Sequence, residues 1–469
     1  QDWPSFYGTL SALRGPDYGK PIVDDLNKAR PLWRSEANCL SGWGTGADSR
    51  YRTRAAYGTL CGGSSSPVVA GGLVYLYHYR PSGDVEPAGP DAEVLAKFKD
   101  NPHEFDAIRR WYSKRADVVV SCVDGATGRT VWESVWSAKQ GNYQTHKWRG
   151  NNHTPTVAKG VLVVSDYSWG LHAHDAKTGQ LKWTRGGGGD VPHDQGAVGP
   201  VVSGDVVVWA TKAGTFGLDL ATGKELWKAP AAGSARRMVI DGAERVLLVG
   251  EALVLIDPAD GKEIARTPFP GGIENKGKRD IGRGAGSNLV CDGPYVVSFE
   301  TVAPPAGTKD KAGKPVKSVG TVFALKVEGN AIRPAWRHEA AAAMEDGHIG
   351  LCIAKGHVYT AFQTDGAYCI DLATGRTAKH LPGANANSNP IFAAVDDRIF
   401  WQPECQHGKQ HVTLFDANPA AFGPLGGEWT PPHNDTTAYG EMPTANVVVD
   451  GRLIIRGMDG LYCYDLRKR

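Results

Sequence analysis

The sequence lacks any apolar run close to the ~18 residues that a membrane-spanning helix needs. It also lacks net charge, because 52 Lys and Arg nearly offset 50 Asp and Glu to leave +2. A balance this even does not favour nucleic acid or an anionic membrane surface as a partner. We therefore expect no nucleic-acid binding and no membrane insertion.

The eight cysteines lack the spacing of a metal site, since they include no CxxC pair and no suitable Cys/His set. Three of them, Cys122, Cys369 and Cys463, each stand two residues before the Asp of a recurring turn. Equivalent positions in a repeat have similar apolar surroundings, so we interpret these three as buried thiols. Cys39 and Cys61 form the one pair that we consider for a disulfide.

One phrase recurs through the chain and is clearest at Asp175-Ala-Lys-Thr-Gly179, followed by Trp183. Asp can accept hydrogen bonds within its own turn, and Gly tolerates the positive φ that tight turns need. The phrase returns with its Trp at Asp124–Gly128 and Asp219–Gly223, and without it at Asp257–Gly261 and Asp371–Gly375. A phrase that repeats at roughly 40–50 residues between short alternating strands predicts a β-propeller.

The repeats predict an all-β fold, which we interpret as an eight-bladed β-propeller forming a single domain over residues 1–469. Eight short apolar segments, such as Pro67-Val-Val-Ala-Gly71, match the inner strands of eight blades. The chain ends after inner strands, whereas Pro31-Leu-Trp33 resembles an outer strand without its predecessors. We therefore expect an N-terminal strand, residues 33–38, to close the last blade.

Residues 79–116 interrupt the first blade and are predicted to form a helical insertion on the face that carries the longer loops. Apolar residues recur at helical spacing from Asp91 to Arg115, around a break at Pro102. Loops with added structure on one face of a rigid ring often form a binding or catalytic site.

The residues just before the inner strands form a polar set at the expected mouth of the central channel. We predict His153, His348 and Tyr439 as proton-transfer groups, since His is suited to proton transfer near neutral pH. Arg236 and Arg237 are predicted to hold a carboxylate or sulfate. The remaining predicted substrate-binding residues are Asn152, Gln195, Trp169, Trp148, Asn389 and Glu441.

This set favours β-elimination from a uronic acid, so we expect a carbohydrate-active lyase that cleaves an acidic polysaccharide or oligosaccharide. Glu441 with Asp194 or Asp346 could instead form a hydrolytic pair. A divalent metal is another open alternative, although no local ligand spacing supports it.

The repeated Asp-x-x-Thr-Gly-x-x-x-Trp phrase resembles the repeat of pyrroloquinoline-quinone (PQQ) dehydrogenases and their relatives. The opening Asp2-Trp-Pro-Ser-Phe-Tyr-Gly8 resembles the mature start of exported PQQ-like propellers of planctomycetes. The resemblance implies a periplasmic or secreted protein, which we expect to be a monomer. It leaves two alternatives to the lyase: a non-catalytic binding or assembly propeller, and a PQQ-dependent dehydrogenase. The dehydrogenases carry adjacent cysteines beside the cofactor and this sequence has none, so we do not expect PQQ.

Overall fold

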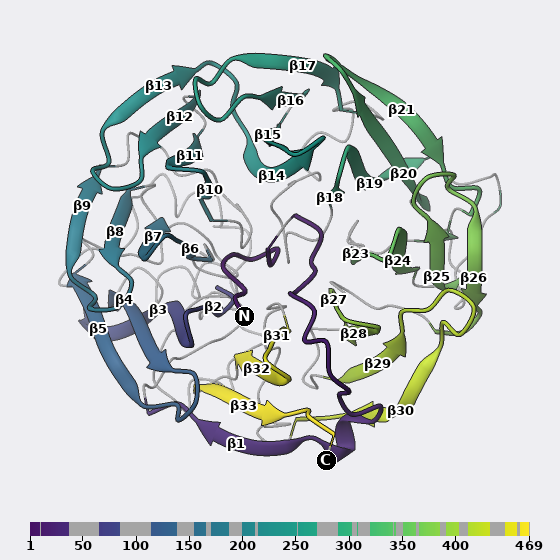
Figure 1. The fold of residues 1–469 in the computed structure, drawn as a ribbon, viewed down its shortest axis with the longest axis horizontal. Helices are drawn as coiled ribbons and strands as arrows, with labels where there is room; N and C mark the ends of the chain where they lie inside the picture. Colours follow the sequence, from purple (N-terminus) through teal and green to yellow (C-terminus); the bar gives the residue numbers. More distant parts are fainter. Residues whose placement is uncertain are drawn as a thin grey trace, which may run out of the picture.

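The computed structural model describes residues 1–9, 11–36, 65–84, 114–137, 154–165, 170–186, 199–211, 214–250, 252–269, 289–302, 307, 319–340, 342–343, 350–362, 365–384, 391–402, 411–431, 446–456 and 460–468. In this part of the chain, 33 strands and one short 3-10 helix, η1 (Leu26–Lys28), form eight antiparallel sheets. The sheets follow one another around a ring (Figure 1). The predicted eight-bladed β-propeller is therefore confirmed.

Each of the first seven blades contains four consecutive strands, ordered from the ring axis to the rim. Blades one and two are β2 (Val68–Ala70), β3 (Leu73–Asp84), β4 (Lys114–Asp124), β5 (Thr130–Ser137), and β6 (Thr156–Ala158), β7 (Val161–Ser165), β8 (Leu171–Asp175), β9 (Leu181–Arg185). Blades three and four are β10 (Val201–Ser203), β11 (Val206–Thr211), β12 (Gly214–Asp219), β13 (Glu225–Ala229), and β14 (Ser234–Ile240), β15 (Ala243–Val249), β16 (Ala252–Ile256), β17 (Glu263–Pro268).

The second half of the ring repeats this order, with one small strand added to blade five. Blade five is β18 (Leu289–Asp292), β19 (Tyr295–Val302), β20 (Val319–Glu328), β21 (Ala331–Arg337) and the added β22 (Ala342–Ala343), which pairs with β20. Blades six and seven are β23 (Leu351–Ala354), β24 (His357–Phe362), β25 (Gly366–Asp371), β26 (Thr377–Leu381), and β27 (Ile391–Val395), β28 (Arg398–Gln402), β29 (Val412–Asp416), β30 (Pro424–Trp429). Blade eight is β31 (Val447–Val449), β32 (Arg452–Arg456), β33 (Leu461–Asp465) and the N-terminal β1 (Arg30–Arg34).

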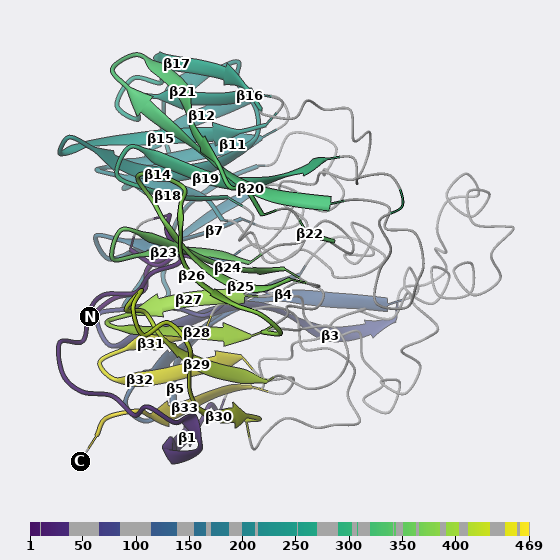
Figure 2. The ribbon, with the colours of Figure 1, turned by 90° about the vertical axis from the view of Figure 1, so that its right-hand side faces the viewer.

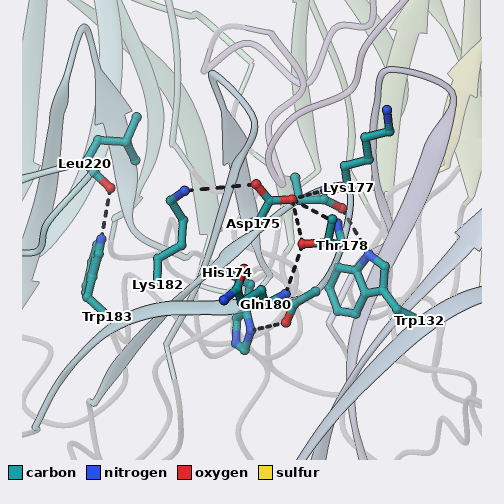
Figure 3. Close-up of polar contacts among 11 residues, drawn as sticks. Trp132, His174, Asp175, Lys177, Thr178, Gln180, Lys182, Trp183 and Leu220 are labelled. Carbon is teal, nitrogen blue, oxygen red and sulfur yellow. Dashed lines mark hydrogen bonds and ion pairs between the residues drawn. The ribbon is translucent and has the colours of Figure 1, made fainter.

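The recurring phrase forms the turn between the third and fourth strands of a blade. In blade two, Asp175 Oδ1 accepts hydrogen bonds from the amides of Lys177 (3.1 Å) and Thr178 (2.9 Å) and from Thr178 Oγ1 (3.0 Å) (Figure 3). Gly179 closes the turn at φ 75°, in the left-handed region that favours glycine. The sequence thus specifies the turn through the carboxylate of Asp175, the hydroxyl of Thr178 and a glycine at the position with positive φ.

The repeat tryptophans connect neighbouring blades. Trp132 of blade one donates its indole N–H to Ala176 O (3.1 Å) in the blade-two turn (Figure 3). Its ring lies so close to Gly179 that a Cβ there would be 2.5 Å from Trp132 Cδ2. The same hydrogen bond links four further pairs: Trp33 to Gly125, Trp183 to Leu220, Trp227 to Pro258, and Trp336 to Leu372. Trp183, Trp227 and Trp429 are buried.

β1 closes the ring by pairing antiparallel with β33, from Arg30 opposite Asp465 to Arg34 opposite Tyr462. This strand was expected at residues 33–38. It begins and ends earlier because the ladder finishes where Ser35 N donates to Leu461 O, the first residue of β33. Blade eight therefore combines the N-terminal strand β1 with the three strands β31, β32 and β33, as the sequence indicated.

The structure corrects part of the predicted helical insertion at 79–116. Residues 79–84 and 114–116 are strand, because β3 and β4 remain paired as far as Asp84 opposite Lys114. The predicted helix, which was expected to end at Arg115, is therefore wrong for Lys114 and Arg115. Residues 85–113 lie outside the described residues, and the described part of the chain contains no α-helix.

The N-terminal segment, residues 1–22, crosses the ring on the side of the short turns (Figures 1 and 2). Trp3 pairs with Val69 of the innermost strand of blade one. Three consecutive carbonyls then accept hydrogen bonds from the inner strands of three consecutive blades: Ser11 from Cys291, Ala12 from Ile353, and Leu13 from Ala394. The segment holds several blades together at the ring axis.

The three cysteines predicted as core thiols, Cys122, Cys369 and Cys463, are buried and free. Burial raises the pKa of each thiol to about 12, so all three are protonated at neutral pH. Cys39 and Cys61 lie outside the described residues.

Candidate functional site

The two ends of the ring differ in what covers the axis. On the short-turn side, Asp2 Oδ1 accepts from Gly71 N in the first turn of blade one, and Asp396 accepts from Tyr18 N and Gly19 N at blade seven. The N-terminal segment thus occupies this end. A ligand that binds on the axis would be held from the opposite end, toward which β3 and β4 project in Figure 2.

Most of the predicted site residues lie outside the described residues. These are His153, His348, Tyr439, Asn152, Gln195, Trp169, Trp148, Asn389 and Glu441. Their roles stay predictions. The structure describes the two remaining members of the set, Arg236 and Arg237, which both lie on the inner strand β14.

Arg236 is buried, with 1% of its surface exposed. Its guanidinium lies 4.5 Å from the centroid of the Tyr7 ring, and Nη1 donates to Ser234 Oγ (3.2 Å) and Ala235 O (3.0 Å). Burial raises the pKa of Tyr7, while the nearby Arg236 charge acts in the opposite direction. Arg236 therefore packs against the N-terminal segment from within the ring.

Arg237 is half-buried and also contacts the N-terminal segment, since Nη1 donates to Thr9 O (3.1 Å). Its Nη2 forms an ion pair with Glu244, a residue of β15. Burial tends to raise the pKa of Glu244, but hydrogen bonds from Arg237 and Ser203 lower it overall, so this carboxylate is ionised. The described contacts of both arginines are with groups of the protein itself.

A hydrogen-bonded chain that the sequence did not indicate crosses blade one. His78 Nε2 lies 2.9 Å from Ser121 Oγ, and Ser121 Oγ donates to Glu133 Oε1 at 2.8 Å. The serine lies between the imidazole and the carboxylate, and its hydroxyl donates a hydrogen bond to the carboxylate. The order needed for nucleophilic catalysis has histidine in the middle, so this chain serves to connect β3, β4 and β5.

A second cluster lies between blades five and six. Tyr368 donates to Asp365 Oδ2 (2.5 Å), and the His380 ring stacks on Tyr368 with centroids 4.1 Å apart. Burial raises the pKa of Tyr368 and lowers that of His338, which lies beside it. Both groups are neutral at pH 7, so Tyr368 is a hydrogen-bond donor here and not a base.

Metal ligands do not gather in the described part of the chain, where no three His, Cys, Asp or Glu side chains are placed to share an ion. The helices of the same part include none long and apolar enough to cross a membrane. A metal centre with three such ligands would therefore need residues from the segments between the described ranges.

The architecture defines a propeller built from PQQ-like repeats, in which tryptophans dock on the turns of the next blade. The family model described as "Outer membrane protein assembly factor BamB" matches residues 116–380, more than half of the chain. The chain belongs to this family of PQQ-like propellers.

One curated relative is the tetrathionate hydrolase of Acidithiobacillus ferrooxidans, 28% identical over 201 residues. The match covers 38% of this chain and 39% of that relative, so the chain spans well under half of the relative's length.

Three solved structures are similar to this chain at low identity, and one of them, with a TM-score above 0.5, supports the fold. The computationally designed Ika8 protein is 11% identical with a TM-score of 0.54, covering 93% of this chain and 99% of that one. BamB from Moraxella catarrhalis is 16% identical with a TM-score of 0.47, covering 74% and 90%. Quinohemoprotein alcohol dehydrogenase from Comamonas testosteroni is 15% identical with a TM-score of 0.42, covering 97% and 82%. At these identities the likeness concerns the fold alone.

These comparisons overturn the prediction of a polysaccharide lyase. The family is that of an assembly factor, the curated relative is a tetrathionate hydrolase, and none of these names describes a carbohydrate-active protein. The prediction rested on residue types at loop ends, and a polar ring of His, Arg and Asn does not specify one chemistry. The predicted polysaccharide partner and the clamp of Arg236 and Arg237 on a uronic acid are withdrawn with it.

Proposed function

We propose that this chain is a non-catalytic propeller that binds protein partners during the assembly of outer-membrane proteins. The observation that carries the proposal is the match of the assembly-factor family over residues 116–380. In this role the protein acts outside the cytoplasm, in the periplasm, where such partners pass.

The described structure supports a binding role through its unequal ends. The N-terminal segment covers the short-turn end, so we propose that partner contacts fall to the opposite end. Trp148 and Trp169, for which the sequence predicted a binding role, are the residues we consider for these contacts. Aromatic side chains are enriched where proteins bind one another, because they bury a large area with few rotatable bonds. We propose these two residues as partner contacts.

Depletion tests this function in the cell that makes the protein. The amount of folded outer-membrane β-barrel protein, measured by its heat-modifiable migration on gels, should fall on depletion and return with the wild-type chain. A Trp148→Ala/Trp169→Ala chain should fail to restore it. Leu226→Ala, which changes a rim residue that is 50% exposed, is the matched control and should restore it fully. Unchanged β-barrel levels after depletion would contradict the proposal.

The PQQ-like repeat favours a second candidate, a quinone-dependent dehydrogenase. PQQ would supply a two-electron acceptor. Titration of the purified protein with PQQ and Ca²⁺, followed by tryptophan fluorescence, tests this candidate directly. Saturable quenching together with alcohol-dependent dye reduction would favour the dehydrogenase, and no binding would leave the assembly role.

A further inference from the structure

The outer strand of blade one, β5, differs from the other seven outer strands of the ring. Outer strands have an unpaired edge, and proteins protect such edges with charged side chains, lysine above all, or with proline. Each of the other seven contains at least one Lys, Arg or Pro. β5, with the sequence TVWESVWS, contains none and is the longest of the eight at 8 residues.

β5 also lies at the centre of an apolar part of the rim. The described residues with large exposed apolar side chains are Leu32, Val131, Val135, Leu181 and Leu226. They all lie on β1, β5, β9 and β13, which follow one another around one side of the ring (Figure 1). Val131 and Val135 of β5 are each 47% exposed. Two of the five apolar side chains therefore stand on the one outer strand that has no Lys, Arg or Pro and whose single charged residue is Glu133.

We propose that β5 pairs antiparallel with β5 of a second copy of this chain, about a two-fold axis at Ser134. The pairing joins two blade-one sheets into one continuous sheet and makes a homodimer through the rim. It replaces our expectation of a monomer. The dimer goes beyond the proposed function, because the pairing of β5 does not depend on which partner the propeller binds.

The accessible length of β5 sets the position of the axis. Thr130 N already donates to Glu36 Oε2 (3.0 Å), so the strand available to a partner begins at Val131. Residues Val131–Ser137 have Ser134 at their midpoint. No described strand pairs with the outer edge of β5, whose only ladder partner is β4.

The charge on β5 excludes a neighbouring register and is compatible with the axis at Ser134. With the axis at Ser134, Trp132 lies opposite Trp136 and Glu133 lies opposite Val135 of the other copy. An axis at Glu133 would place two carboxylates opposite each other, which is destabilising. A shift of the pairing by one residue would place side chains from opposite faces of the two sheets on the same side of the joined sheet. Glu133 is held by Ser121, so it is not free to turn away from such a clash.

The tryptophans of β5 are already ordered before any pairing. Trp132 donates to Ala176 O, and Trp136 stacks on His172 with ring centroids 4.4 Å apart. Pairing would therefore cost little side-chain entropy, and preorganised surfaces bind more tightly than flexible ones. A strand that is ordered, self-complementary and without Lys, Arg or Pro fits a second copy better than an unrelated peptide.

Sedimentation velocity on the full chain tests the dimer. The molar mass obtained for the wild-type protein should be twice that of one chain. Ser134→Lys and Ser134→Glu each place like charges on the axis, and each variant should be a monomer, with association weakened at least about tenfold. An equal mixture of the two variants should regain the dimer, because opposite charges then face each other. This restoration cannot come from a folding defect.

Leu226→Lys provides the matched control, since it puts the same charge on an equally exposed outer strand two blades away. This variant should remain dimeric. A wild-type chain that is monomeric up to about 100 µM would overturn the proposal. So would dimeric Ser134→Lys, or a mixture of the two Ser134 variants that stays monomeric.

Discussion

Gly179 and Gly160 have almost the same left-handed backbone, at φ 75° and 74°, and differ in their surroundings. A Cβ at Gly179 would be 2.5 Å from Trp132, whereas a Cβ at Gly160 would meet nothing within 4 Å. We expect Gly160→Ala to cost about 1–2 kcal/mol from backbone strain alone. Gly179→Ala should cost about 2 kcal/mol more, because the docked indole must move.

Urea unfolding of the two variants measures this difference. Equal losses of stability would show that the docked tryptophan tolerates displacement. The comparison isolates the packing of one ring, because the backbone strain is common to both variants.

Buried histidines and turn aspartates make stability depend on pH in two stages. Burial lowers the pKa of His174 and His338, so the unfolded chain binds more protons below its own His pKa of about 6.5. Stability should first decline as the pH falls through this range. Hydrogen bonds from Thr178 lower the pKa of Asp175, and Thr374 does the same for Asp371, so a second decline should begin below about pH 4.

The melting temperature between pH 3 and pH 8 would show both stages. A His174→Gln/His338→Gln chain should lose the first decline and keep the second. If the first decline persists in this variant, other groups are responsible for it.

The N-terminal segment acts as one element across several blades. Removal of residues 1–15, with β1 retained, deletes the acceptors of the Cys291, Ile353 and Ala394 amides. Each lost hydrogen bond is worth about 1 kcal/mol, so these three amides should exchange at least about fivefold faster. The Gly179 amide, bonded to Asp175 O in blade two, is the internal control and should be unaffected. Uniformly faster exchange would show instead that the segment stabilises the whole ring.

The turns and strands were the part of this fold that the sequence could predict. Asp, Thr, Gly and Trp act within one turn or between neighbouring blades, so their spacing carries the architecture. The crossing by the N-terminal segment could not be predicted, because its contacts with blades five to seven include hydrogen bonds to the backbone carbonyls of Ser11, Ala12 and Leu13. Any residue supplies a carbonyl, so no residue type marks these positions.

The candidate site was much harder to predict than the fold. Arg236 was predicted as a substrate clamp because a guanidinium can hold a carboxylate or sulfate through two hydrogen bonds. It lies instead against Tyr7, more than 200 positions away in the sequence, a contact that no local pattern reveals. The buried chain from His78 through Ser121 to Glu133 was missed for the same reason, since its members come from three different strands.

Closure of the whole ring depends on β1. A chain without residues 1–36 would leave the edge of β33 unpaired and Asp465 without its Arg30 partner. We expect this chain to unfold at a lower urea concentration and to elute as large species in gel filtration, because exposed edges promote aggregation. A monodisperse truncated chain with an unchanged midpoint would show that three strands are enough for blade eight.

The pairing of Arg30 with Asp465 joins residues that lie 435 positions apart. During synthesis, β1 leaves the ribosome before β33 has been made. β1 must therefore wait unpaired while the strands of the seven intervening blades are made. The ring stays open until β1 docks on β33, so this pairing is a late step of folding.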